Sequence, residues 1–322
     1  MPYPTSFRRF LAELWRASAP LTLVAFLMLI ALAGTAIALP LDHRTITGMP
    51  AWIKPAKFAI STAIYSASVA WLLRYTTVWP RFVRAMSWTL ATGLLVEVGI
   101  IYLQAARGTT SHFNVARPVD AALFSIMGIF IGLLWLSSVG ILIALFRQKF
   151  NRPAWGWALR LGMLITVLGS AAGGMMLRPT RAQLRVANES GTVTAVGGHT
   201  VGAPDGGPGL PVLGWSTEHG DLRISHFFGL HGLQVIPFFT WLLIRRRPEQ
   251  KHVQGTAVIA ASYALLVVIL GWQALRGQSI TQPDSVTASV AVVWLAASAI
   301  AIALTNTTAR KIQIVPGFRA IN

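Results

Sequence analysis

Cysteine is absent from the 322 residues of this chain. The chain therefore forms no disulfide bond, offers no thiolate ligand to a metal, and lacks the C-x-x-C-H motif that attaches haem covalently. Any metal or haem site must therefore use ligands other than a thiolate, such as histidine or a carboxylate. Seven histidines and ten acidic residues supply these ligand types.

Charged residues are also scarce, at 11% of the chain against 54% hydrophobic residues. This composition excludes an ordinary soluble domain. Apolar runs that approach or exceed the roughly 20 residues needed to cross a bilayer as a helix occur eight times, at residues 20–40, 57–74, 84–105, 121–146, 155–177, 226–244, 253–273 and 285–305. We predict an all-α integral membrane protein with about eight transmembrane helices, the first of which resembles a signal peptide but is retained.

Negative charge is the scarcer sign, with 10 acidic against 27 basic residues. Basic residues near the ends of spans are retained on the cytoplasmic side. With both termini inside, 17 of the 27 basic residues fall on the cytoplasmic side. We therefore predict a multi-pass protein with both termini in the cytoplasm. The net charge of +17 reflects topology and contact with the lipid bilayer; no basic face outside the membrane flanks indicates a nucleic-acid partner.

An internal repeat is indicated by a five-residue motif. Gln104-Ala-Ala-Arg-Gly108 recurs 169 residues later as Gln273-Ala-Leu-Arg-Gly277, and the same offset aligns Lys57-Phe58 with His226-Phe227. A shift of four spans preserves direction across the membrane, which predicts two parallel four-helix halves, residues 1–150 and 151–322. A chance match of short apolar segments is the alternative.

The second half contains a long outer loop, residues 178–225, that is rich in glycine and proline between residues 197 and 214. These residues disfavour a regular helix or a central strand in that stretch. The loop also contains apolar residues such as Leu210 and Trp215, which predicts a compact lid resting on the bundle. No Gly-Lys-Ser/Thr motif follows, so the glycines do not indicate a nucleotide site.

Six of the seven histidines fall at the predicted outer face. Neutral imidazole is a common ligand for transition metals, and we predict a site for a transition metal or haem b from His112, His199, His219, Asp221 and His226. Acidic outer loops also arise from the positive-inside rule alone, but that rule does not explain the histidines. His226 and His231 are five residues apart, about 140 degrees around a helix, so they have separate roles.

Glu97 is the one carboxylate in the middle of a predicted span. An ionisable group at that depth costs several kcal/mol unless it is paired or protonated. We predict that Glu97, His231 and Gln234 form a catalytic or proton-relay group; a neutral carboxyl hydrogen-bonded between helices is the alternative. Basic and amide groups toward the outer face are predicted to bind substrate: Lys57, Gln104, Arg107 and Arg276.

Three strings, QAARGTTSHFN, GGHTVGAPDGGPGLP and GDLRISHFFGLH, resemble segments of an uncharacterised family of bacterial polytopic membrane proteins. The resemblance implies a location in the bacterial inner membrane and no particular activity. The four-plus-four plan is also similar to that of haem A synthase, in which histidines of each half bind haem. The Glu-x-x-x-His pattern of that enzyme is missing from this chain, however.

Two functional classes follow from these features. The first is a membrane enzyme or redox protein with a metal or haem site at the outer face. The second is a proton-coupled transporter or permease that uses Glu97 and His231 for a small molecule or ion. A membrane assembly or partner-binding subunit is a third interpretation, in which the outer loop is an interface.

Overall fold

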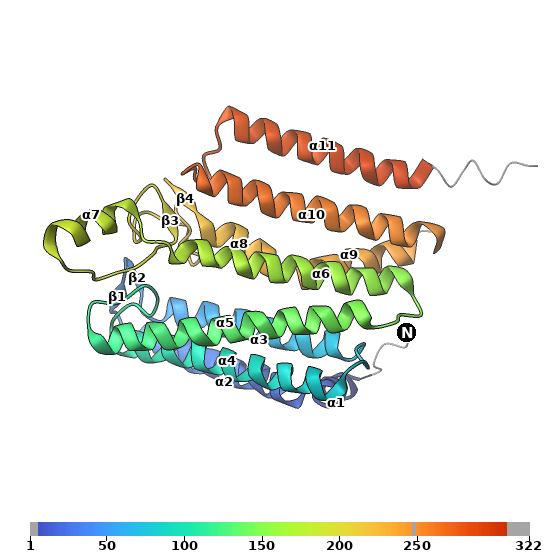
Figure 1. Ribbon diagram of the computed structural model, residues 1–322, viewed down its shortest axis with the longest axis horizontal. Helices are drawn as coiled ribbons and strands as arrows, with labels where there is room; N and C mark the ends of the chain where they lie inside the picture. The colour runs from blue at the N-terminus through green and yellow to red at the C-terminus, as the bar shows by residue number, and fades with distance from the viewer. Residues whose placement is uncertain (1–5, 247–248, 308–322) are drawn as a thin grey trace, which may run out of the picture.

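The computed structural model describes residues 6–246 and 249–307. Long helices run side by side, and the short strands, helix α7 and the longest loops gather at one end of the bundle, which we call the lid face (Figure 1). The helices are α1 (Phe7–Ala17), α2 (Ala19–Leu41), α3 (Ile53–Leu73), α4 (Pro80–Ala106), α5 (Pro118–Arg147), α6 (Pro153–Ala172), α7 (Arg181–Ser190), α8 (Leu222–Leu230), α9 (Gly232–Arg246), α10 (His252–Leu275) and α11 (Ser285–Thr307), with 3-10 turns η1 (Gly173–Leu177) and η2 (Glu249–Lys251). Of the basic residues that support the predicted orientation, Arg247, Arg310, Lys311 and Arg319 lie outside the described residues.

The prediction of an all-α protein that spans a membrane many times is confirmed. Seven described helices are long and apolar enough to cross a bilayer, and the bent pair α8 and α9 makes eight if the pair is counted as one span. Helix α1 precedes them as a short segment with its arginines Arg8 and Arg9 exposed and only Leu14 buried. Helix α11 ends on the same side of the bundle as α1 begins (Figure 1).

The span predicted at residues 226–244 is broken in the structure. Helices α8 and α9 meet at an angle of 50° around His231. Pro237 lies one turn inside α9, where it cannot donate a hydrogen bond to the carbonyl of Leu233 and its ring presses on that carbonyl. The predicted apolar run is long enough to cross a bilayer. The break within it depends on contacts with neighbouring helices, which the apolar pattern does not reveal.

Side chains of two neighbouring helices stabilise this break. The hydroxyl of Thr166 on α6 donates to the carbonyl of Leu230 and accepts the N–H of Leu233, at 3.2 and 2.9 Å. The hydroxyl of Tyr263 on α10 donates to the carbonyl of Phe228 at 2.6 Å. Backbone groups freed by a break inside a membrane need such partners because no water is available to them.

We expect Thr166→Val to destabilise the protein by about 1–3 kcal/mol, because it leaves a buried carbonyl and a buried N–H without their partner. The shift would be measured as thermal unfolding in detergent. Thr89→Val is the matched control, since the Thr89 hydroxyl is exposed and bonds only to Ala85 of its own helix. Equal shifts for the two variants would contradict the role assigned to Thr166.

Glycines allow α6 to approach the broken span closely. A Cβ on Gly169 would overlap the backbone of Gly229, and a Cβ on Gly162 would lie 2.9 Å from the carbonyl oxygen of Gly232. A Cβ on Gly173 would lie 2.9 Å from the ring of His226. These contacts fix α8 and α9 against α6 and thereby place His226 close to the lid face.

Residues 178–221, which we call the lid segment, join η1 to α8 at the lid face. Residues 194–196 lie antiparallel to residues 113–115, with hydrogen bonds from Val115 N–H to Thr194 and from Val196 N–H to Phe113. Strand β3 (Thr200–Val201) then pairs with β4 (Gly220–Asp221) just before α8, while β1 (Thr45–Ile46) and β2 (Met49–Pro50) form a separate hairpin. The segment also forms α7, before its glycine-rich part, which the sequence analysis did not predict.

Candidate functional site

The best-connected group of ionisable side chains joins α3, α4 and the loop of residues 107–117. Glu97 lies nine residues before the end of α4, about 13 Å along the helix axis, and its side chain is only 5% exposed. The loop reaches down to it, so that His112 Nε2 lies 3.2 Å from Glu97 Oε1. Lys54, in the first turn of α3, places Nζ 3.0 Å from His112 Nδ1. We call Lys54, His112 and Glu97 the relay cluster.

The hydrogen bonds of the relay cluster decide the tautomer of His112. An ammonium group only donates, so Nδ1 of His112 accepts from Lys54, and in the neutral ring the proton lies on Nε2, which is 3.2 Å from Glu97 Oε1. Burial, and then the charge of Lys54, lowers the pKa of His112 well below its ordinary value. A neutral imidazole therefore lies between Lys54 and Glu97. The second oxygen of that carboxylate, Glu97 Oε2, is buried and accepts no hydrogen bond from any described residue.

Local contacts hold His112 in this position. Phe113, the next residue, has a left-handed backbone with φ of 63°, which turns the loop sharply. The Asn114 amide donates to the Thr109 hydroxyl and to the carbonyl of Thr110, at 3.0 and 3.2 Å. The lid segment completes the support through the hydrogen bond from Val196 to Phe113. The histidine is thus oriented by its own loop and by a segment more than 80 residues away.

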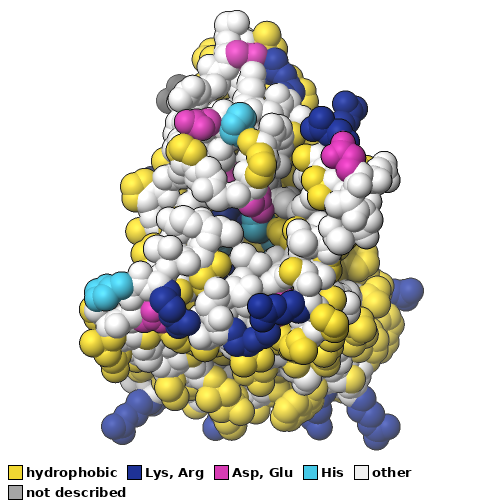
Figure 2. Space-filling model, turned by 90° about the vertical axis from the view of Figure 1, so that its left-hand side faces the viewer, with side chains coloured by type: hydrophobic (Ala, Val, Ile, Leu, Met, Phe, Trp, Pro, Cys, Tyr) yellow, Lys and Arg dark blue, Asp and Glu magenta, His cyan; other side chains and the backbone are white. Residues whose placement is uncertain are grey.

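A second pair of a histidine and a carboxylate lies in the lid segment. His199 Nδ1 is 2.8 Å from Asp205 Oδ2, and the His199 ring packs edge-on against Phe113 with ring centres 4.9 Å apart. Phe113 also contacts the ring of His112, at 6.0 Å between centres. The two imidazoles therefore flank one phenyl ring. Figure 2 views the lid face and shows a central hollow in which histidine, acidic and basic side chains lie close together.

The residues predicted to bind a metal are placed as follows. His112 belongs to the relay cluster, His199 pairs with Asp205, and His226 Nδ1 donates to the carbonyl of Gly169 at 2.8 Å. Asp221 caps α8, and both of its oxygens bond to Arg223. Across residues 6–246 and 249–307, no three such side chains are arranged to hold a metal ion. His219 lies beside Gly202 of the lid segment. A site for a transition metal or haem b stays a prediction.

The deeper predicted group is divided in the structure. His231 lies at the break between α8 and α9, where its ring contacts Phe227 with centres 4.4 Å apart. The Gln234 amide donates to Ser68 on α3 at 2.9 Å. The side chain beside Glu97 is that of His112, and no described contact connects Glu97 to His231.

The residues predicted to bind substrate have other contacts. Gln104 donates to Asp120 and to the carbonyl of Thr110, and Arg107 pairs with Asp120. In the same way Gln273 donates to the carbonyl of Ser279, and Arg276 pairs with Asp284. These contacts close the ends of α4 and α10, where Gly108 and Gly277 adopt φ of 72° and 75°. Lys57 donates to the carbonyl of Leu213 in the lid segment, at 2.9 Å.

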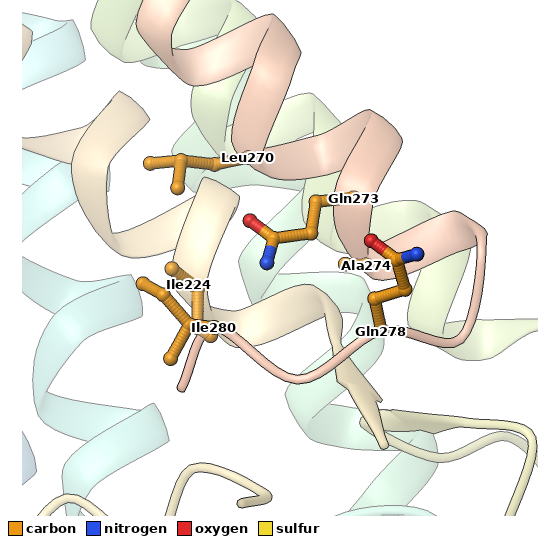
Figure 3. A pocket seen from close by; sticks show the side chains of 6 residues that line it. All are labelled: Ile224, Leu270, Gln273, Ala274, Gln278 and Ile280. Atoms are coloured by element: carbon orange, nitrogen blue, oxygen red, sulfur yellow. The ribbon is translucent and has the colours of Figure 1, made fainter. Parts of the chain in front are cut away.

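A small recess beside α10 does not resemble a binding site. It has no room for a water molecule and is lined by Ile224, Leu270, Gln273, Ala274, Gln278 and Ile280 (Figure 3). Its two amide side chains are already hydrogen-bonded, Gln273 to Ser279 and Gln278 to the Thr287 hydroxyl. The recess holds no unpaired charge or titratable side chain.

Sequence reasoning missed two important residues. Lys54 was not among the predicted site residues, although it lies at the same helix start as Lys57. Asp205 lies among glycines and prolines, and its spacing of six residues from His199 matches no common motif. The available signal was chemical, since an amine buried at the start of an apolar helix and a carboxylate in a glycine-rich loop both require partners.

Comparison with known proteins identifies no family for this chain: no family model, curated protein or solved structure matches it.

Proposed function

We propose that this protein is an integral-membrane enzyme that performs acid–base chemistry in the relay cluster at its lid face. The observation that supports the proposal is the neutral imidazole of His112 between the ammonium group of Lys54 and the carboxylate of Glu97. Buried ionisable groups of opposite type in direct contact are typical of catalytic sites, although structural networks share this feature. The lid segment supplies the cover that would exclude water.

The cluster can change its protonation state without changing its net charge. If Lys54 gives a proton to His112 Nδ1 while His112 Nε2–H gives its proton to Glu97, two N–H bonds break and one N–H and one O–H bond form. The ammonium and carboxylate become an amine and a carboxylic acid. The amine is then a base or nucleophile, and the acid is a proton donor, which are the two groups that acid–base catalysis requires.

The location of the site is part of the proposal. The distribution of basic residues supports an arrangement in which the lid face is the outer face of the bacterial inner membrane and both termini are cytoplasmic. The matching ends of α4 and α10 support a relationship between residues 1–150 and 151–322, since Gln104 and Gln273 each close a turn that ends in a left-handed glycine. The relay cluster belongs to the first half in this scheme.

We expect His112→Asn to reduce turnover by about 100- to 10,000-fold, the usual contribution of general acid–base catalysis. The full chain in nanodiscs would be incubated with total bacterial lipid and a panel of water-soluble metabolites, and products identified by untargeted mass spectrometry. His43→Asn is the control, because His43 is exposed in another loop of the lid face. Absence of any product from the wild type, or unchanged turnover by His112→Asn, would contradict the proposal.

A proton-coupled transporter is a second candidate, favoured by the broken span. Discontinuous helices form substrate sites in many transporters, and Gln234 beside the break has a buried amide oxygen with no described hydrogen-bond partner. In proteoliposomes containing a pH-sensitive dye, a transporter would acidify the lumen only when a transported metabolite is present. Glu97→Gln would abolish this signal, whereas acidification that is unaffected by Glu97→Gln would exclude the proposed role of Glu97.

A further inference from the structure

Asp205 uses its carboxylate almost entirely to position one histidine. Its oxygens accept the backbone N–H of His199 at 2.9 Å, the N–H of Thr200 at 2.8 Å and a bond from His199 Nδ1 at 2.8 Å. Burial favours the neutral acid, but these hydrogen bonds hold the pKa of Asp205 well below its ordinary range. Because an ionised carboxylate only accepts, His199 Nδ1 must be the donor.

The other nitrogen of His199 is consequently a free base. Burial lowers the pKa of His199; the bond to Asp205 opposes this shift, and the charges of Arg223 and Lys54 add to it. The neutral ring carries its proton on Nδ1, so Nε2 has a lone pair, and it accepts no hydrogen bond from the described parts of the chain. His112 differs, since both of its ring nitrogens are engaged.

The backbone of the lid segment fixes this base beside the relay cluster. Gly197 has φ of 94° and lies so close to the carbonyl of Met176 that a Cβ would overlap it. Gly198 N–H donates to the same carbonyl at 2.9 Å, and the carbonyl of His199 accepts the N–H of Leu222 at 3.0 Å. His199 is therefore held from both sides against Phe113, which also contacts the ring of His112.

We propose that His199 is a second acid–base residue of the site, a general base contributed by the lid segment, and that Asp205 is its positioning residue. This inference rests on the proposed function. His199 Nε2 takes the proton of a substrate hydroxyl group or a water molecule: the O–H bond breaks, an N–H bond forms, and the electron pair stays on oxygen for attack. Asp205 stabilises the imidazolium ion that results, as the carboxylate of a catalytic triad does.

Diethyl pyrocarbonate tests the state of each histidine, because it modifies an unprotonated imidazole nitrogen with a lone pair. In the full chain in nanodiscs, rates at individual histidines would be measured by peptide mass spectrometry. We expect His199 to react at least about tenfold faster than His112, whose Nδ1 accepts from Lys54 and whose Nε2 carries the ring proton beside Glu97. A slower reaction at His199 than at His112 would overturn the proposal.

Asp205→Asn tests whether Asp205 sets the tautomer of His199 or only supports the fold of the lid segment. Its amide can donate to Nδ1 and favour the tautomer with the proton on Nε2, so we expect the rate at His199 to fall at least about tenfold. Losing the carboxylate also lowers the pKa of His199, which moves the midpoint of the rate-against-pH profile to lower pH. Asp205→Glu should restore part of the rate. Glu218→Gln, which changes an exposed acid of the lid segment, should change neither quantity.

The outcomes distinguish this inference from the proposed function. An unchanged rate and midpoint at His199 in Asp205→Asn would overturn the role of Asp205, even if turnover still depended on His112. Conversely, a fast, Asp205-dependent reaction at His199 together with turnover that does not require His112 would overturn the relay cluster alone. Unaltered hydrogen exchange of the Val196 amide in Asp205→Asn would show that the lid segment keeps its place.

Discussion

Lys54→Met is expected to lower the free energy of unfolding by about 3–5 kcal/mol, because it removes the cation that lies across His112 from Glu97 and leaves the buried carboxylate without a compensating charge. Glu97 is only 5% exposed, and its second oxygen already lacks a hydrogen-bond partner among the described residues. Without Lys54, the carboxylate would keep only the neutral His112 as a donor. A charge in that environment must then be neutralised by protonation or be stabilised by a local rearrangement.

The double variant Lys54→Met/Glu97→Leu should recover most of this loss. Replacing both members of a buried pair by apolar groups is often neutral or stabilising, because the cost of desolvating two charges disappears with them. Chemical unfolding in mixed micelles would measure the free energy of unfolding of the wild type, the two single variants and the double variant, which together form a double-mutant cycle. Additive effects would show that Lys54 and Glu97 are not coupled through His112.

A surface pair provides the control for this cycle. Arg44 and Asp42 form a hydrogen-bonded ion pair on the lid face, but Arg44 is exposed. An exposed pair contributes much less than a buried one. Arg44→Gln should therefore change the stability much less than Lys54→Met does.

Gly169→Ala is expected to destabilise the protein by about 1–3 kcal/mol, the usual cost of overpacking a close contact. The added Cβ would overlap the backbone of Gly229 on α8, so one of the two helices must move. Moving α8 would also disturb the hydrogen bond from His226 Nδ1 to the Gly169 carbonyl. The loss should appear as a lower thermal midpoint in detergent.

The same substitution on α5 is the control. A Cβ on Gly128 would meet no atom within 4 Å, so Gly128→Ala should leave stability unchanged or raise it by up to about 1 kcal/mol through helix propensity. Similar losses at both positions would mean that the contact between α6 and α8 is not the cause.

The spans were predictable because they depend on local composition. A run of apolar residues of sufficient length forms a helix in a bilayer wherever its neighbours lie, and each predicted run overlaps a helix or the bent pair. The break at His231 was not predictable in this way. It depends on Thr166 and Tyr263, which are 65 residues before and 32 residues after it and show no periodic signal of their own.

The sequence indicated that Glu97 needs a partner, but it did not indicate which residue the partner is. Glu97 requires a partner by its depth alone, and the positive-inside rule does not explain the histidines at the predicted outer face. The sequence suggested His231 because it also lies in a span, whereas the structure brings His112 down from a loop. That approach requires the left-handed turn at Phe113 and a ladder with residues 194–196, which are long-range features that no short motif encodes.

The ladder between residues 113–115 and residues 194–196 has a mechanical consequence. Together with β3 and β4, it joins a loop between α4 and α5 to the start of α8 by backbone hydrogen bonds across the lid face. The groups α1–α5 and α6–α11 therefore cannot separate at this end without unzipping the ladder. The opposite end is joined by the short connection between α5 and α6, where Arg160 of α6 donates to the carbonyls of Leu145 and Gln148. The two groups are therefore tied to each other at both ends, and a hinge motion that parts them must break hydrogen bonds at one end or the other.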